Sequence, residues 1–156
     1  MDLAEKLDAI EGIKMAKARY FRGIDTKDRD LLRSIFTDDV ELDCRGAAID
    51  PVTGHNFAPQ TDEIIRGGDN AAYLASTSLT GVVSVHHASA PEIEITGPNT
   101  GSAIWPMVDR LRFGEGAPIK ELIGYGHYFD TYERVGSTWR IKTMRLVRTR
   151  MDAVVW

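Results

Sequence analysis

The sequence predicts an α+β domain in which helices cover one face of a strongly curved, mostly antiparallel sheet. Helical periodicity is confined to the first half of the chain, whereas the second half consists of long strand-like segments joined by short turns. Short turns connect antiparallel neighbours, and helices that precede such a sheet pack on one of its faces. We therefore predict a cone-shaped barrel with three helices in its N-terminal half and an interior suited to a ligand.

The first helix is expected over residues 3–24, because apolar residues recur there at steps of three and four. The stripe comprises Leu3, Leu7, Ile10, Ile13, Ala16, Tyr20 and Ile24. Charged residues occupy the other side, and Gly23 and Asp25 mark the end of the helix. A short second helix follows, for which Thr26 is the candidate N-cap. Its apolar face comprises Leu31, Leu32, Ile35 and Phe36.

The first strand is expected from Val40 to Cys44, where apolar and acidic residues alternate. Residues 46–68 are the least regular segment, with several glycines and two prolines, so we expect a loop that closes over a pocket. A third short helix is expected over residues 69–79, capped by Asp69. The remaining strands are expected over residues 82–95, 101–113, 119–135 and 138–150.

Composition argues against several classes of partner. The 156 residues, 43% of them hydrophobic and 27% charged, suit one soluble domain covering residues 1–156. The net charge of −4 lacks the basic excess of a nucleic-acid-binding protein. No apolar run approaches the ~18 residues of a membrane span, and no signal peptide is visible. We therefore expect no nucleic-acid or membrane partner and a cytoplasmic location.

Motifs for several common chemistries are missing from the sequence. There is no glycine-rich phosphate loop, no GxSxG elbow and no HExxH motif. The adjacent His86 and His87 are poorly spaced for binding one metal. The single cysteine, Cys44, lies among acids in a predicted strand and is expected to be a small core residue. We therefore predict no cofactor and no metal.

Histidine is the side chain best suited to exchange protons near neutral pH, and the chain has four. His86 and His87 are neighbours on a predicted strand, so only one of them can face a cavity. Alternation with Val83 and Val85 favours His87, but Pro91 disrupts the pairing nearby. Spacing alone therefore does not decide between the two histidines.

A catalytic histidine needs an acceptor that fixes its tautomer, and Asp25 is the best candidate. A solvated aspartate at a helix end would look the same in the sequence. On an ideal helix Tyr20 and Asp25 point roughly 140° apart. Both can reach one cavity only if the helix loosens near Gly23 or if both lie at the rim.

The last predicted strand contributes an arginine. Its apolar phase changes around Thr143, which predicts a β-bulge and places Arg148 and Arg150 on the apolar face. A buried arginine requires an anionic or polar partner, which makes Arg148 a candidate site residue. The alternative is a frayed strand with both arginines in water.

Four segments resemble the SnoaL-like proteins of the nuclear transport factor 2-like superfamily: IKMAKARYFRGIDTKDRDLLRSIFTDDV, SVHHASAPEIEI, AIWPMVDRLRF and GHYFDTYERVGSTWRIKTMRLVRTR. The resemblance spans nearly the whole chain and implies the cystatin-like cone fold. Within the family, the YFR-x-x-D and H-x-x-x-x-P-E-I patterns are similar to those of bile acid 7α-dehydratases, and more distantly to scytalone dehydratases and hexachlorocyclohexane dehydrochlorinases. The resemblance implies four catalytic residues: Tyr20, Asp25, His86 and Arg148. It therefore selects His86 over His87. Ser89 replaces a second histidine of the bile acid enzymes, which leaves the substrate open.

We therefore expect a cofactor-independent dehydratase that acts on a small hydrophobic cyclic molecule. His86 would be the base, oriented by Asp25, while Tyr20 and Arg148 would bind the leaving hydroxyl or an enolate oxygen. Four further residues are predicted to line the substrate pocket: His87, His127, Trp105 and Tyr128. Two alternatives stay open, an isomerase or cyclase using the same pair and a non-catalytic binding module. Because family members form dimers or trimers, the resemblance also implies a homodimer or homotrimer.

Overall fold

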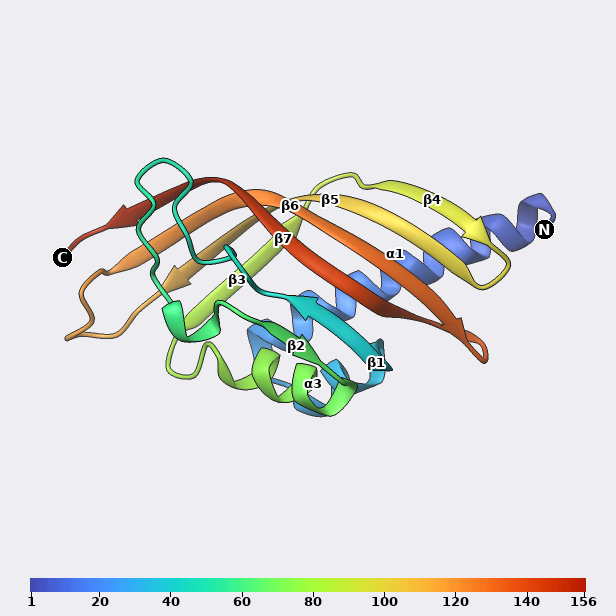
Figure 1. Ribbon diagram of the computed structural model, residues 1–156, viewed down its shortest axis with the longest axis horizontal. Helices are drawn as coiled ribbons and strands as arrows, with labels where there is room; N and C mark the ends of the chain where they lie inside the picture. The colour runs from blue at the N-terminus through green and yellow to red at the C-terminus, as the bar shows by residue number, and fades with distance from the viewer.

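Three α-helices and one seven-stranded sheet make up the computed structural model, which describes residues 1–156 (Figure 1). The helices are α1 (Leu3–Thr26), α2 (Arg29–Ile35) and α3 (Gly68–Thr77), with a 3-10 turn at Pro59–Thr61. The strands are β1 (Phe36–Asp43), β2 (Ile64–Arg66), β3 (Val83–Ala88), β4 (Glu92–Gly97), β5 (Thr100–Arg112), β6 (Glu121–Val135) and β7 (Thr138–Val154). None of the helices combines the length and apolarity needed to cross a membrane.

The strand order is β2-β1-β7-β6-β5-β3, and β4 pairs with β5 beyond the end of β3. Every neighbouring pair is antiparallel except β1 and β7, which are parallel. The predicted α+β class and curved antiparallel sheet are thus confirmed. The sheet curls over α1 but its edges do not pair with each other, so the cone is open (Figure 1).

α1 extends along the sheet and ends beside β3 (Figure 1). It begins with a capping box, in which the Asp2 side chain accepts from the Glu5 backbone and the Glu5 side chain accepts from the Asp2 backbone. Of the predicted apolar stripe, Leu3 and Leu7 are exposed, Ile10 is half-buried, and the members from Ile13 onward are buried. The packed face of α1 is therefore its C-terminal two thirds, which contains the predicted site residues.

Two predicted helix caps are wrong. Thr26 belongs to the last turn of α1, and Asp28 caps α2 by accepting a hydrogen bond of 2.9 Å from a backbone N–H of its first turn. The chain reverses between the two helices at Lys27, a left-handed residue with φ of 57°. α3 begins without a side-chain cap, and Asp69 in its first turn instead accepts a hydrogen bond from Arg33 (2.9 Å).

The predicted strand over residues 82–95 is two strands, β3 and β4, separated by Ser89–Pro91. Pro91 has no backbone N–H to donate to a ladder, so pairing stops there. Both strands pair with β5, which is long enough to serve one after the other: His87 lies opposite Val108, and Ile93 lies opposite Ala103.

β7 contains the predicted bulge and a second one. The register against β6 skips Lys142, which restores the inward phase at Met144 and explains the change seen around Thr143. It skips Thr149 in the same way. This second bulge separates the two arginines: Arg148 faces inward, whereas Arg150 is exposed, so the predicted inward position of Arg150 is wrong.

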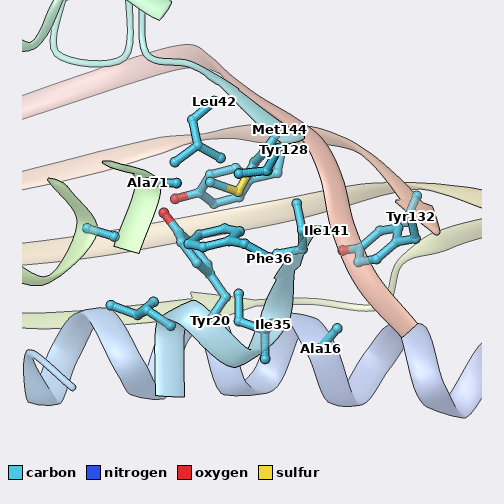
Figure 2. Packing of buried hydrophobic residues seen from close by; sticks show 14 of the residues in the cluster. Ala16, Tyr20, Ile35, Phe36, Leu42, Ala71, Tyr128, Tyr132, Ile141 and Met144 are labelled. Atoms are coloured by element: carbon cyan, nitrogen blue, oxygen red, sulfur yellow. The ribbon is translucent and has the colours of Figure 1, made fainter. Parts of the chain in front are cut away.

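The core lies between the helices and the inner face of the sheet, as a single cluster of 22 buried residues. Figure 2 shows Tyr20 rising from α1 toward Tyr128 of β6, with Phe36 and Ile141 packed beside them. Several charged or titratable side chains are buried in the same interior, one from α1 and three from the inner face of the sheet: Lys17, His86, Asp109 and Asp130. Burial of such groups is costly unless they are paired, so their partners define the polar part of the interior.

Candidate active site

A cavity of about 280 Å³ lies between the inner face of the sheet, α3 and the loop that precedes β2. Nineteen of its 26 lining residues are hydrophobic, so it is suited to an apolar ligand. The loop predicted over residues 46–68 does border it, through Phe57 and Ala58 among others. Five polar residues of the cavity wall come from adjacent strands and from α1: Tyr20, His86, Asp109, Tyr128 and Arg148.

His86 and Asp25 form a close hydrogen-bonded pair. The imidazole is buried, and its Nδ1 lies 2.6 Å from Asp25 Oδ1. The same carboxylate accepts a bond from the backbone N–H of His86 (2.9 Å, Oδ2) and one from the Ser84 hydroxyl (2.8 Å, Oδ1). These contacts exist because β3 runs beside the last turn of α1, which holds one carboxylate against two inward positions of the strand.

Asp25 does not line the cavity but holds His86 from behind. Tyr20 lines the cavity itself. The large angle between these two residues on α1 is therefore no obstacle, and the helix stays regular through Gly23 to Thr26. Neither a loosened helix nor a rim position is needed, because Asp25 contacts the imidazole rather than the cavity.

The hydrogen bonds determine the charge of Asp25. Burial by itself raises the pKa of this carboxyl, but the bonds from the His86 ring, the His86 backbone and Ser84 outweigh it and lower the pKa below the ordinary value. Asp25 is therefore an anion at neutral pH. A carboxylate beside Nδ1 favours the tautomer that carries its proton there, which leaves Nε2 with a free lone pair.

Asp109 is a site residue that the sequence analysis missed. Its carboxylate forms a bidentate pair with Arg148, with Nη1 2.6 Å from Oδ1 and Nη2 3.0 Å from Oδ2. The Arg148 Nε–H donates to the carbonyl of Ala47 (2.7 Å), so the guanidinium also ties the loop to the sheet. His86 Nε2 lies 3.8 Å from Asp109 Oδ2. The imidazole thus lies between two carboxylates, Asp25 on one nitrogen and Asp109 near the other.

A signal for Asp109 was present in the sequence. The inward positions of β5 before it are the buried residues Ala103, Trp105 and Met107. Asp109 continues this phase, and an aspartate in an otherwise apolar phase has to be paired or functional. Its partner Arg148 is distant in sequence, which is why no local pattern links the two.

Tyr20 and Tyr128 supply two phenols. Their rings lie 6.0 Å apart in an edge arrangement, and Figure 2 shows their oxygens directed toward each other between α1 and the sheet. Burial raises the pKa of both phenols, and the Asp109 charge raises that of Tyr128 further. Both therefore remain protonated, so each phenol keeps an O–H that can act as a hydrogen-bond donor.

The prediction that His87 lines the pocket is wrong. His87 is exposed, and Val83 and Val85 are exposed beside it on the outer face of the sheet. Ser84 and His86 occupy the inward phase of β3. The apolar alternation that favoured His87 reflects an uncovered outer face of this chain, so it pointed in the wrong direction.

Two other pocket predictions also fail. His127 is half-buried on the outer side of β6, opposite in phase to Tyr128, which does line the cavity. Trp105 is buried and inward but lies outside the cavity, where its Nε1–H donates to the Tyr132 hydroxyl (3.1 Å). Adjacent residues on a strand face opposite sides, so only one of His127 and Tyr128 could have been correct.

Cys44 lies at the cavity wall without the features of a nucleophile. Burial and the neighbouring Asp43 raise the pKa of its thiol to about 11, so it stays protonated at neutral pH. No group of three or more His, Cys, Asp or Glu side chains is arranged to hold a metal ion.

Comparisons with known proteins agree with this architecture. The family model described as "SnoaL-like domain" matches residues 5–145. Among solved structures, a hexachlorocyclohexane dehydrochlorinase (LinA type 2) is 17% identical with a TM-score of 0.78, over 99% of this chain and 94% of that one. A candidate scytalone dehydratase from Novosphingobium aromaticivorans is 20% identical with a TM-score of 0.75, over 97% and 91%. A Mycobacterium tuberculosis protein of unknown function is 22% identical with a TM-score of 0.73, over 96% and 77%.

Proposed function

The chain belongs to the SnoaL-like domain family, and from this premise we propose that it is a cofactor-independent lyase that removes water from a compact, uncharged cyclic substrate. One observation carries the proposal. A histidine held by a carboxylate at 2.6 Å presents its other nitrogen toward an apolar cavity. The similar solved structures include proteins named as a dehydrochlorinase and a candidate dehydratase, which favours elimination as the reaction type.

In the proposed reaction His86 Nε2 removes a proton from a carbon next to a carbonyl group. Asp25 stabilises the imidazolium that forms, and Asp109, 3.8 Å from Nε2, adds a second negative charge nearby. Electrons from the C–H bond form the new double bond as the hydroxyl on the adjacent carbon departs. The imidazolium returns its proton to that hydroxyl, which leaves as water, and the base is regenerated.

The phenols stabilise the oxygen that gains negative charge. Tyr20 and Tyr128 line the cavity as protonated donors, and the Arg148–Asp109 pair lies beside them in the cavity wall. Such donors are preorganised by burial, and the surrounding apolar walls exclude the water that would weaken them. They are suited to a carbonyl oxygen that becomes enolate-like in the transition state.

The charges of the site favour an uncharged substrate. Arg148 spends its Nε, Nη1 and Nη2 donors on Ala47 and Asp109, so it is already neutralised by a bidentate partner. Asp25 adds a further negative charge behind His86. An organic acid or a phosphate would therefore meet net repulsion. The volume of about 280 Å³ lies near the lower end of the ~300–1,000 Å³ usual for ligand pockets, which favours a compact molecule.

A panel of cyclic β-hydroxy ketones incubated in D₂O and followed by NMR tests this proposal. Elimination gives the conjugated enone, and the histidine variant His86→Ala should lose it by roughly 10²–10⁴-fold. His87→Ala is the matched control, because it removes the exposed neighbour on the same strand. Equal turnover by His86→Ala and the unmodified protein would refute the assignment of the base.

An isomerase using the same pair remains the second candidate. One observation favours it: the Asp109 carboxylate lies beside His86 Nε2. This carboxylate can keep the protonated imidazole in the cavity, where it can return the proton to a second carbon of the substrate ring. The same NMR experiment separates the candidates: a shifted double bond without loss of water indicates isomerisation. Binding with neither deuterium exchange nor product would support a non-catalytic ligand-binding module.

A further inference from the structure

Lys17 is a buried cation that the proposed reaction does not use. Its side chain is 1% exposed and extends from α1 into the core behind the cavity. The ammonium donates to Asp130 Oδ2 (2.8 Å) and to Met144 Sδ (3.4 Å). Asp130 Oδ2 also accepts a bond from the Tyr132 hydroxyl (2.8 Å). The pair lies outside the set of residues that line the cavity.

Folding stability does not readily explain why the buried Lys17–Asp130 ion pair is present. Burial lowers the pKa of Lys17 to about 8 even though Asp130 opposes the change, and burial raises the pKa of Asp130. The second oxygen of Asp130, Oδ1, has no hydrogen-bond partner. Buried ion pairs of this kind are often matched or exceeded in stability by apolar residues of similar size. A different role for the charge is therefore worth seeking.

The ammonium contacts the aromatic residues of the site. Lys17 Nζ lies 3.5 Å from the centroid of the Tyr128 ring and 5.0 Å from that of Tyr20. It also lies 5.3 Å from the ring of Phe21, which stacks on the imidazole of His86 at 6.1 Å and 14°. The positive end of the buried pair is thus in contact with both phenols and with the ring that packs on the proposed base.

We propose that Lys17 is a positioning residue that strengthens Tyr20 and Tyr128 as hydrogen-bond donors to an oxygen atom of the ligand. The proposal rests on the proposed function in one respect, that these phenols bind such an oxygen. A phenol that donates to a negative oxygen gains negative charge itself, and a cation at its ring face stabilises that charge. Asp130 keeps the ammonium in place and protonated.

The expected effect is roughly tenfold. At an effective dielectric constant of ~20, the attraction between the Lys17 ammonium and a negative oxygen at about twice hydrogen-bond distance corresponds to more than a tenfold effect. The opposite charge of Asp130 cancels part of this attraction. The charge of Lys17 acts on a bound oxygen through the rings of Tyr20 and Tyr128, because Lys17 itself does not line the cavity. The groups on the cavity side that also affect a bound oxygen are unchanged in the test: His86, Asp109 and Arg148.

The test uses p-nitrophenol, whose absorbance reports whether its oxygen is protonated. Its apparent pKa when bound is measured in the unmodified protein and in the Lys17→Met/Asp130→Asn double variant, which removes both charges and keeps similar shapes. Lys142→Met/Asp39→Asn is the matched control, since it removes an ion pair of the same kind at the surface. Lys17→Met alone is the second variant, in which Asp130 takes up a proton, should the double variant not fold.

We expect the apparent pKa of bound p-nitrophenol to rise by roughly one unit in the Lys17 variants and to stay constant in the control. With a turned-over substrate, kcat should fall roughly tenfold while KM stays within about twofold. An unchanged pKa in a folded Lys17 variant overturns the inference and leaves the proposed function standing. A raised pKa without turnover of any substrate supports the inference and counts against the lyase. Failure of p-nitrophenol to bind the unmodified protein overturns it too, because the phenols then hold no oxygen.

Discussion

Replacement of Asp25 by asparagine should block the proposed base by changing its tautomer. Asp25 accepts three hydrogen bonds, two at Oδ1 (Ser84 hydroxyl and His86 Nδ1) and one at Oδ2 from the fixed backbone N–H of His86. An amide has one oxygen and one NH₂ group. Its oxygen must face the backbone N–H, which cannot change its direction, so the NH₂ faces Nδ1. Nδ1 then becomes an acceptor, the ring proton moves to Nε2, and the lone pair needed in the cavity is lost.

The expected loss in kcat is roughly 10²–10⁴-fold, which is the range for removing a general base or for holding a catalytic histidine in the wrong tautomer. This equals about 2.7–5.4 kcal/mol in activation free energy. The loss in folding stability should be smaller, about 1–3 kcal/mol, because two of the three bonds can still form and Asp25 is only half-buried. A domain of ordinary stability, ~5–15 kcal/mol, tolerates that loss.

Two measurements check this prediction. NMR of ¹⁵N-labelled histidine reports the tautomer of His86, and NMR in D₂O reports the rate of deuterium exchange and elimination. Asp28→Asn is the matched control, because the same chemical change at the N-cap of α2 leaves a good cap and does not touch His86. The reasoning is refuted if folded Asp25→Asn keeps the Nδ1–H tautomer, or if its rate stays within about threefold of the unmodified protein.

Three further results are expected. Replacement of Arg148 by methionine should leave Asp109 buried without a partner and lower the free energy of unfolding by about 3–5 kcal/mol. The control Arg150→Met, at an exposed position, should change it by less than ~0.5 kcal/mol. Urea denaturation measures both. Gly124→Ala should displace the Arg148–Asp109 pair, because an added Cβ would overlap both side chains. Since Asp109 lies 3.8 Å from His86 Nε2, this displacement should lower kcat roughly tenfold or more. Gly114→Ala, in open space, is the control, and equal rates of the two variants would contradict the assignment. Because the pKa of Asp25 is lowered in the folded protein, its contribution to stability is present above about pH 4 and is lost as pH falls through the folded pKa. The difference in free energy of unfolding between the unmodified protein and Asp25→Asn should therefore shrink below about pH 4. A constant difference from about pH 7 to pH 3 would contradict the hydrogen bonds to Asp25.

Local patterns predicted the elements of the fold but not their ends. Periodicity identified the three helices and most strands, since it reports which face of an element is buried. The caps of α2 and α3 were misplaced, and the division of residues 82–95 into β3 and β4 was missed. The start of α2 depends on the single hydrogen bond that Asp28 accepts, and the break between β3 and β4 depends on Pro91, which has no N–H to donate to β5. Neither is determined by the apolar pattern.

The site shows the same limit in two opposite ways. The phase change around Thr143 predicted the bulge that turns Arg148 inward. The second bulge, at Thr149, is marked by the buried Met151, which lies one position beyond the predicted end of this strand at residue 150, and Arg150 was therefore misplaced. On β3 the apolar residues Val83 and Val85 face outward, so hydrophobicity there does not indicate the core. It was the family resemblance, rather than the alternation, that selected His86.

The sequence by itself determined the class of fold, the phase of most strands and a set of polar residues that needed partners, because each of these depends on neighbours in the chain. Only the tertiary structure decided which partners they found. Asp25 meets His86 across 61 positions, Arg148 meets Asp109 across 39, and Lys17 meets Asp130 across 113. Charges buried in an apolar interior must be paired, but a linear sequence does not specify which opposite charge the folding of the sheet brings within reach.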